Sequence, residues 1–227
     1  TAYEIMPSLV GSEMCIRDSF LTQIKSVREE YRSGVAVSAV VVGIAGYHYY
    51  RIWSGFSVGE MNEGYRYADW LITVPLLIVE LLIVLGVASA LRKSLMWKLV
   101  PASILMIGLG YPGEISSSTG TKWVFWIMAV IPFIYILYVL YGQLQEAQKR
   151  ETGAVATSIK NATLVLLSTW CVYPIAYLFP IFDAESGTLE TLRQVGYTFA
   201  DITAKGLYGL MILSIAKARS TESKSSS

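Results

Sequence analysis

Residues 64–85 read GYRYADWLITVPLLIVELLIVL, an apolar run interrupted by three charged side chains, Arg66, Asp69 and Glu80. The run is long enough to cross a bilayer, which takes about 20 predominantly apolar residues in a helix. Asp69 and Glu80 are eleven positions apart, close to three turns, so they share a helix face and lie about 16 Å apart along its axis. Because a charge inside a membrane helix is costly, each of the three is a candidate functional residue.

The whole chain has the composition of a membrane protein. It is 54% hydrophobic and 15% charged, whereas soluble domains carry about 25% charged residues. With a net charge of +1 and no basic stripe outside the loops, we expect a lipid bilayer as partner and no nucleic acid. Six stretches are long and apolar enough to span the membrane: roughly 34–53, 67–91, 95–112, 123–142, 161–182 and 195–216.

The charged loops predict the orientation of these spans. Cytoplasmic loops carry an excess of Lys and Arg, so we expect an integral protein of the cell membrane with a cytoplasmic C-terminus. The same rule puts the residues before the 34–53 stretch inside, which predicts one earlier helix. The basic residues gather in alternate connections: Lys25, Arg28, Arg32, Arg92, Lys93, Lys98, Lys149, Arg150, Lys160, Lys217, Arg219 and Lys224.

The N-terminal residues do not look like that earlier helix. Residues 1–19 are polar and aperiodic, and LVGSEMCIRDS (9–19) resembles a translated sequencing adapter. We therefore expect 1–19 to be non-native or disordered, 20–220 to form the membrane domain, and 221–227 to be a disordered cytoplasmic tail. A natural polar N-terminal tail is the alternative for 1–19. The fold expected is an all-α bundle of which the chain supplies helices two to seven.

The last span also carries charge near its middle. It reads LRQVGYTFADITAKGLYGLMILSIAKA (192–218), with Asp201 and Lys205 four residues apart on one face. Lys205 is too deep to extend its amine easily to an interface, although a purely structural ion pair is an alternative. Arg66 taken alone could be an interfacial anchor. His48, in GIAGYHYYRIW (43–53), is the only histidine and taken alone is more often a core residue. Together with Asp69 and Glu80, these positions favour a functional path.

Three motifs carry a resemblance to a known family: RYADWLITVPLL (66–77), STWCVYPIAY (168–177) and ADITAKGLYG (200–209). They resemble the third-, sixth- and seventh-helix motifs of the microbial (type 1) rhodopsins, and within them the proteorhodopsin and xanthorhodopsin group. GYPGE (110–114) and His48 point to the xanthorhodopsin-like branch. The resemblance covers about residues 25–220 and implies a seven-helix rhodopsin bundle, here without a recognisable first helix.

The resemblance also implies a role for each site residue. Lys205 would bind all-trans retinal as a protonated Schiff base, and Asp69 would be its counterion and proton acceptor. Glu80 would return a proton from the cytoplasmic side. Supporting roles fall to Asp201 as second counterion, to Arg66 and Thr73, and to His48 as partner of Asp69. The residues expected to surround the chromophore or bind Asp201 are Trp70, Leu77, Trp170, Tyr173, Tyr177 and Tyr49.

These roles make the chain a light-driven outward proton pump and not an enzyme. A sensory rhodopsin is the alternative within the fold, but such proteins commonly lack a carboxylic donor such as Glu80. Sodium and chloride pumps use other residues at the Asp69, Thr73 and Glu80 positions. A small secondary transporter would predict inverted repeats and broken helices, which the sequence does not have. Cys15 and Cys171 form no disulfide framework, and no metal-binding spacing is present.

Two positions refine the expected chromophore. Leu77 corresponds to a position that is Leu in green-absorbing and Gln in blue-absorbing proteorhodopsin-like pumps. Trp126 matches a fifth-helix glycine that opens a window for a carotenoid antenna in some xanthorhodopsin-like pumps. An indole would fill that window, so we expect no carotenoid antenna, although Trp126 as a lipid-facing belt residue is the alternative. A homo-oligomer is expected, in which His48 faces a neighbouring copy.

Overall fold

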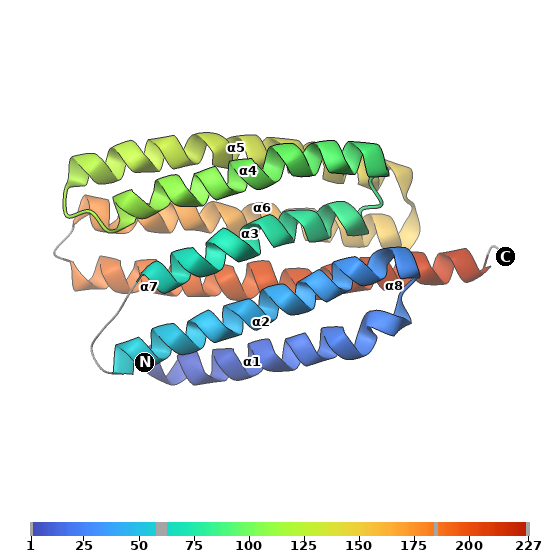
Figure 1. Cartoon of the computed structure of the whole chain (residues 1–227), viewed down its shortest axis with the longest axis horizontal. Helices are drawn as coiled ribbons and strands as arrows, with labels where there is room; N and C mark the ends of the chain where they lie inside the picture. Colours follow the sequence, from blue (N-terminus) through green and yellow to red (C-terminus); the bar gives the residue numbers. More distant parts are fainter. Residues whose placement is uncertain (1, 58–62, 184–185, 226–227) are drawn as a thin grey trace.

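The computed structural model describes residues 2–57, 63–183 and 186–225, and every regular element in these ranges is helical. Figure 1 shows the helices as an elongated antiparallel bundle. The α-helices are α1 (Ala2–Gln23), α2 (Glu29–Ser57), α3 (Gly64–Val84), α4 (Ser89–Glu114), α5 (Thr119–Arg150), α6 (Gly153–Phe182), α7 (Gly187–Asp201) and α8 (Tyr208–Ser225). A short 3-10 helix η1 (Ile24–Ser26) and a π-helical turn η2 (Ile202–Leu207) complete the chain order.

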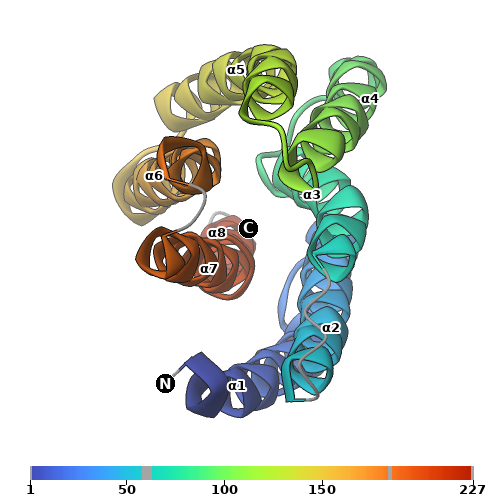
Figure 2. The ribbon, with the colours of Figure 1, turned by 90° about the vertical axis from the view of Figure 1, so that its left-hand side faces the viewer.

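Seven rods result, because α7, η2 and α8 form one continuous helix in space (Figure 1). Seen end-on, α1 to α6 follow a curved path and the α7–α8 rod lies on the inside of that curve (Figure 2). The π turn within this rod holds residue 205, the predicted chromophore lysine. A π turn inside an α-helix is uncommon and is frequent at functional sites.

Six rods are long and apolar enough to cross a membrane, as the sequence predicts: Glu29–Gly55, Gly64–Val84, Ser89–Glu114, Thr119–Arg150, Gly153–Phe182 and Gly187–Thr221. Their outward faces carry large apolar side chains, with Tyr138 78% and Ile131 66% exposed on α5. Such a surface suits lipid contact and would be unusual on a soluble monomer. The protein is an integral membrane protein.

The expectation of a missing first helix is not confirmed, because α1 occupies residues 2–23 and lies along α2 (Figure 2). Phe20 of α1 is fully buried in the main core. The polar residues of α1 make this helix less apolar than the six spans, which is why hydropathy did not reveal it as a membrane helix. The non-native origin of residues 1–19 and the limits of the membrane domain stay predictions. Helix α8 runs to Ser225 and so extends into residues 221–227, which were expected to form the tail.

The boundary between the second and third spans differs from the prediction, since α3 ends at Val84 instead of near 91. Gly86 causes the difference, because its φ of +64° lies in the left-handed region that favours glycine. A Cβ at this position would also lie 2.7 Å from the Arg219 guanidinium. The positive φ therefore favours glycine here, and the helix turns early.

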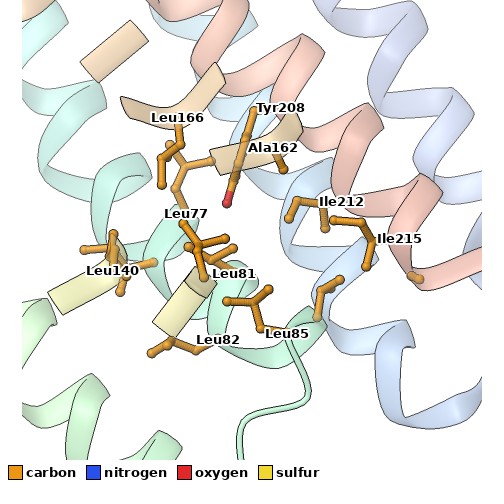
Figure 3. Close-up of a cluster of buried hydrophobic side chains, with 14 of the residues drawn as sticks. Leu77, Leu81, Leu82, Leu85, Leu140, Ala162, Leu166, Tyr208, Ile212 and Ile215 are labelled. Carbon is orange, nitrogen blue, oxygen red and sulfur yellow. The ribbon is translucent and has the colours of Figure 1, made fainter. Parts of the chain in front are cut away.

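The core has two parts with different chemistry. One cluster, at the end of the bundle where α3 finishes, is almost wholly aliphatic; Figure 3 shows Leu77, Leu81, Leu82, Leu85, Leu140, Leu166 and Ile212 converging there with Tyr208. The other, near the start of α3, is mainly aromatic: Tyr67, Trp70, Ile107, Ala176, Tyr177, Ile181 and Tyr197. Below, the Arg66 end and the Glu80 end denote the parts of the bundle on either side of Lys205 that contain Arg66 and Glu80.

Candidate functional site

Lys205 lies at the centre of the site and is 1% exposed. Its amine contacts the Asp69 carboxylate of α3, and Asp201 Oδ2 of α7 is 3.3 Å from Nζ. The spacing predicted Asp201 as a partner of this lysine and the family resemblance implied Asp69, and the structure brings all three together. A buried amine with two buried carboxylates carries a local charge of −1, which calls for a further cation or proton nearby.

The two carboxylates differ in their hydrogen bonds. Asp201 accepts three, from Tyr49 OH at 2.5 Å, Tyr173 OH at 2.6 Å and Trp70 Nε1 at 2.9 Å. These donors compensate for the water that a buried carboxylate loses. Tyr49 and Tyr173 thus occupy the positions expected for them beside Asp201.

Asp69 has fewer partners than Asp201. Apart from the Lys205 contact at Oδ2, its Oδ1 has no hydrogen-bond partner among the described residues. His48 Nδ1 is 3.8 Å from that oxygen, an ion-pair distance too long for a hydrogen bond, and is 3.0 Å from the Ile44 carbonyl oxygen. Thr73 is fully buried one turn away, where its hydroxyl donates to the Asp69 carbonyl oxygen at 2.9 Å and not to the carboxylate.

An apolar cavity extends from Lys205 between α3, α4, α5 and α6. Five of the predicted chromophore residues line it, namely Trp70, Leu77, Trp170, Tyr173 and Tyr177. Tyr49 does not line it and instead binds Asp201. Trp126, expected to fill the window for a carotenoid, also lines it. The sequence did not identify the remaining lining residues, which are Tyr67, Val74, Met106, Ile107, Gly110, Ala129, Val130, Phe133, Pro174, Tyr197 and Ala204.

Glu80 lies on the opposite side of Lys205 from Arg66 and is fully buried. Its Oε1 accepts a hydrogen bond of 2.5 Å from the Ser38 hydroxyl of α2. Leu77 and Leu81, two members of the aliphatic cluster that Figure 3 labels, lie three residues before it and directly after it in α3, and no described basic residue forms an ion pair with it. Ser38 is a site residue that the sequence analysis missed, since serine is common in membrane helices.

At the Arg66 end a network of polar side chains continues from the site. Arg66 is 2% exposed, its Nη2 donates to Gln194 Oε1 at 2.8 Å, and its Nε lies 3.6 Å from Glu63 Oε2. Gln194 Nε2 in turn donates to Glu63 at 2.5 Å and to Glu190 at 2.9 Å. Arg66 is therefore held in a built position and is not an isolated interfacial anchor.

Arg193 is the second cation of this network. Its guanidinium contacts Glu114, and its Nη2 lies 2.6 Å from Glu190 and 3.4 Å from Glu63. Glu114 also accepts hydrogen bonds from Tyr67 at 3.0 Å and Tyr197 at 3.2 Å. In the sequence, Glu114 stood out only as part of the GYPGE motif of the xanthorhodopsin-like branch. A contact between distant helices leaves no local spacing signal that would predict its partners.

With this geometry in view, comparison with known proteins identifies the family. The family model described as "Bacteriorhodopsin-like protein" matches residues 13–219. The chain belongs to the bacteriorhodopsin-like family. It is a microbial type 1 rhodopsin, as the three sequence motifs indicated.

Named relatives of this rhodopsin agree with the assignment. The green-light absorbing proteorhodopsin of Gamma-proteobacterium EBAC31A08 is 30% identical over 198 residues, 87% of this chain and 79% of that protein. The crystal structure of xanthorhodopsin, titled a light-driven ion pump with dual chromophore, matches with a TM-score of 0.90 and 42% identity, over 98% of this chain and 94% of that one. Thermophilic rhodopsin matches with a TM-score of 0.90, 37% identity and coverage of 97% and 94%.

The residues of this rhodopsin fit retinal, the cofactor that the family binds. The cavity has the apolar, aromatic lining that a polyene needs, and one reactive amine, Lys205, lies at its end. The two carboxylates beside that amine suit a linkage that carries a positive charge. No described group of His, Cys, Asp and Glu has the geometry of a metal site.

The rhodopsin site also contains a carboxyl group that the sequence analysis excluded. Glu13 of α1 is 2% exposed, its Cβ faces Gly46 of α2, and it interacts electrostatically with Lys205. It falls within the 9–19 stretch that resembles an adapter.

Proposed function

We propose that this rhodopsin is a light-driven proton pump that exports protons and carries all-trans retinal on Lys205. The observation that carries the proposal is the position of the Lys205 amine, buried between Asp69 and Asp201 at the end of an apolar cavity, with Glu80 buried on its other side. Lys205 would hold retinal within this cavity, and the bound retinal would supply absorption of visible light and a light-driven isomerisation beside the Lys205 nitrogen.

Asp69 is the carboxylate best suited to accept the proton from Lys205. It touches the amine directly, and its Oδ1 has no hydrogen-bond partner among the described residues. Asp201 already accepts three hydrogen bonds. Protonating Asp201 would therefore lose more hydrogen-bond stabilisation than protonating Asp69. Asp201 then stays ionised, and His48 and Arg66 adjust the charge around the pair.

Glu80 is suited to return a proton to the same nitrogen. Burial in an aliphatic cluster without a counter-charge disfavours an ionised carboxyl, so Glu80 waits as the neutral acid. The acceptor lies toward the Arg66 end and the donor toward the Glu80 end. With the basic loops and the C-terminus in the cytoplasm, this order drives protons outward. Export against 100 mV costs about 2.3 kcal/mol per proton.

The experiment that tests the proposal is expression in cells supplied with all-trans retinal. A visible absorption band and light-induced acidification of the medium, abolished by a protonophore, are expected. A pigment that forms but causes no acidification would instead favour the sensory alternative. Oligomers are expected in detergent, and light scattering coupled to size exclusion would measure their mass.

We expect retinal to be the only chromophore, although the xanthorhodopsin structure is titled as having two. Trp126 lines the cavity, and its indole donates to the Pro174 carbonyl oxygen at 2.9 Å. This hydrogen bond supports the filled-window interpretation over a lipid-facing belt position. A hydroxylated carotenoid should add no structured absorption bands and transfer no energy to retinal, whereas Trp126→Gly opens the window. Carotenoid-sensitised acidification by the unmutated protein would contradict this expectation.

A further inference from the structure

The Tyr208 hydroxyl is a buried polar group that the proton path above does not use. Tyr208 is fully buried, and its hydroxyl has no hydrogen-bond partner among the described residues. A buried hydroxyl without a partner costs its desolvation free energy, whereas phenylalanine would fill the same space without that cost. Packing therefore explains the ring of Tyr208 but not its oxygen.

Glu80 has a matching unpaired atom. Because Ser38 donates to Oε1, that oxygen acts as the carbonyl-type acceptor of the neutral acid. The acidic proton then sits on Oε2, which has no partner among the described residues. A buried O–H without an acceptor and a buried hydroxyl without a partner thus occur in the same part of the bundle.

Along the axis of the bundle, Tyr208 lies between Lys205 and Glu80. Tyr208 is the first residue of α8 after the π turn and follows Lys205 by three positions, about 4–5 Å along the axis toward the Glu80 end. In Figure 3 its hydroxyl points into the aliphatic cluster, toward Leu77 of α3. Glu80 interacts electrostatically with Tyr208. The labelled neighbours in this region are otherwise aliphatic and cannot carry a proton.

From this geometry we propose that Tyr208 relays the proton from Glu80 to the Lys205 nitrogen, directly or across one water molecule at each step. The inference rests on the pump function proposed above. In the relay, the O–H bond of Glu80 breaks and its proton passes to the Tyr208 oxygen. The original Tyr208 proton leaves for the Lys205 nitrogen at the same time. Tyr208 ends neutral, Glu80 ends as a carboxylate, and the proton count is unchanged.

Tyr208→Phe tests the relay because it removes one oxygen and keeps the ring. In flash photolysis at neutral pH, we expect the state with a deprotonated Lys205 nitrogen to decay about tenfold more slowly. The visible maximum should stay within a few nanometres of the original. The infrared carbonyl band of the Glu80 acid should move to higher frequency as its O–H loses an acceptor, a change that a purely structural role would not produce. Tyr111→Phe, at the Arg66 end, is the matched control and should change none of these.

A double variant separates the relay from a general effect on recovery. With Glu80→Gln already present, adding Tyr208→Phe should slow the decay no further, because the relay has no donor to serve. Two results would overturn the relay but leave the pump function intact, provided that the unmutated protein still acidifies the medium in light. One is additive slowing in the double variant, and the other is a decay in Tyr208→Phe that stays within twofold of the unmutated protein. Loss of acidification in the unmutated protein would overturn the pump function and the relay together.

Discussion

The two ends of the bundle surround Lys205 with opposite chemistry. At the Arg66 end, Arg66, Gln194 and Glu63 form a continuous series of hydrogen bonds and ion pairs. On the Glu80 side, Glu80 and its Ser38 partner lie next to the aliphatic cluster. A polar network lets a proton leave through many small steps, whereas an aliphatic region lets one through only where a specific group carries it. For the proposed pump, this difference places the control of direction at the Glu80 end.

The largest effect tests the residue on which both ends depend. Lys205→Ala should abolish the visible band completely, because no other lysine lines the cavity and the retinal linkage needs an amine. Absorption spectra of membranes with added retinal measure this. Lys160→Ala, at the start of α6, is the control and should keep its colour. A visible band in Lys205→Ala membranes would refute the site assignment.

The second test changes the acceptor on the Arg66 side of the amine. Asp69→Asn should stop light-driven acidification and shift the absorption maximum to longer wavelength, because it removes a proton acceptor and a negative charge beside Lys205. A pH electrode and a spectrum suffice. Acidification at the unmutated rate would show that Asp201 or another group accepts the proton.

The third test removes the donor and leaves the Arg66 end intact. Glu80→Gln should leave the colour nearly unchanged and slow reprotonation of the Lys205 nitrogen by about a hundredfold. The hydrogen bond from Ser38 can persist to the amide oxygen, so the fold should be little affected. Flash photolysis at neutral pH measures the decay, and an unchanged rate would exclude Glu80 as donor.

The smallest effect sharpens the comparison by adding one polar group to the aliphatic side. Leu77 is 3% exposed and lines the cavity between Lys205 and the aliphatic cluster. Leu77→Gln should shift a green absorption maximum to shorter wavelength, because an amide changes the electric field along the polyene. Leu77→Met, which keeps the position apolar, should shift it less. A blue maximum in the unmutated protein would contradict the role given to Leu77.

The sequence was sufficient where the signal lies within one helix. Asp69 and Glu80 share a face of α3, and Asp201 and Lys205 are one turn apart on one rod, so spacing alone identified them. The length of the apolar stretches also located six of the seven rods. The first rod escaped notice because α1 is too polar to read as a span, although it packs along α2.

Contacts between helices could not be predicted in this way. Ser38 meets Glu80 from 42 positions away, and Arg193 meets Glu114 from 79 positions away. Serine, tyrosine and loop acids are common residues, so their types gave no warning of these partners. Arg66 was ambiguous for the same reason until its contact with Gln194 was visible.

The π turn at Ile202–Leu207 has a consequence for insertions and deletions. A π turn has one residue more than an α-helical turn, so deleting one residue there would restore the ordinary backbone pattern. Six π-helical residues turn the chain about as far as five α-helical ones, so α8 would keep its orientation relative to α7 and Ile212, which is fully buried, would stay in the core. Deleting one residue from the regular α-helix on either side would instead rotate the rest of the rod by about 100°. We expect the rod to tolerate the loss of one residue better at the π turn than in its α-helical parts.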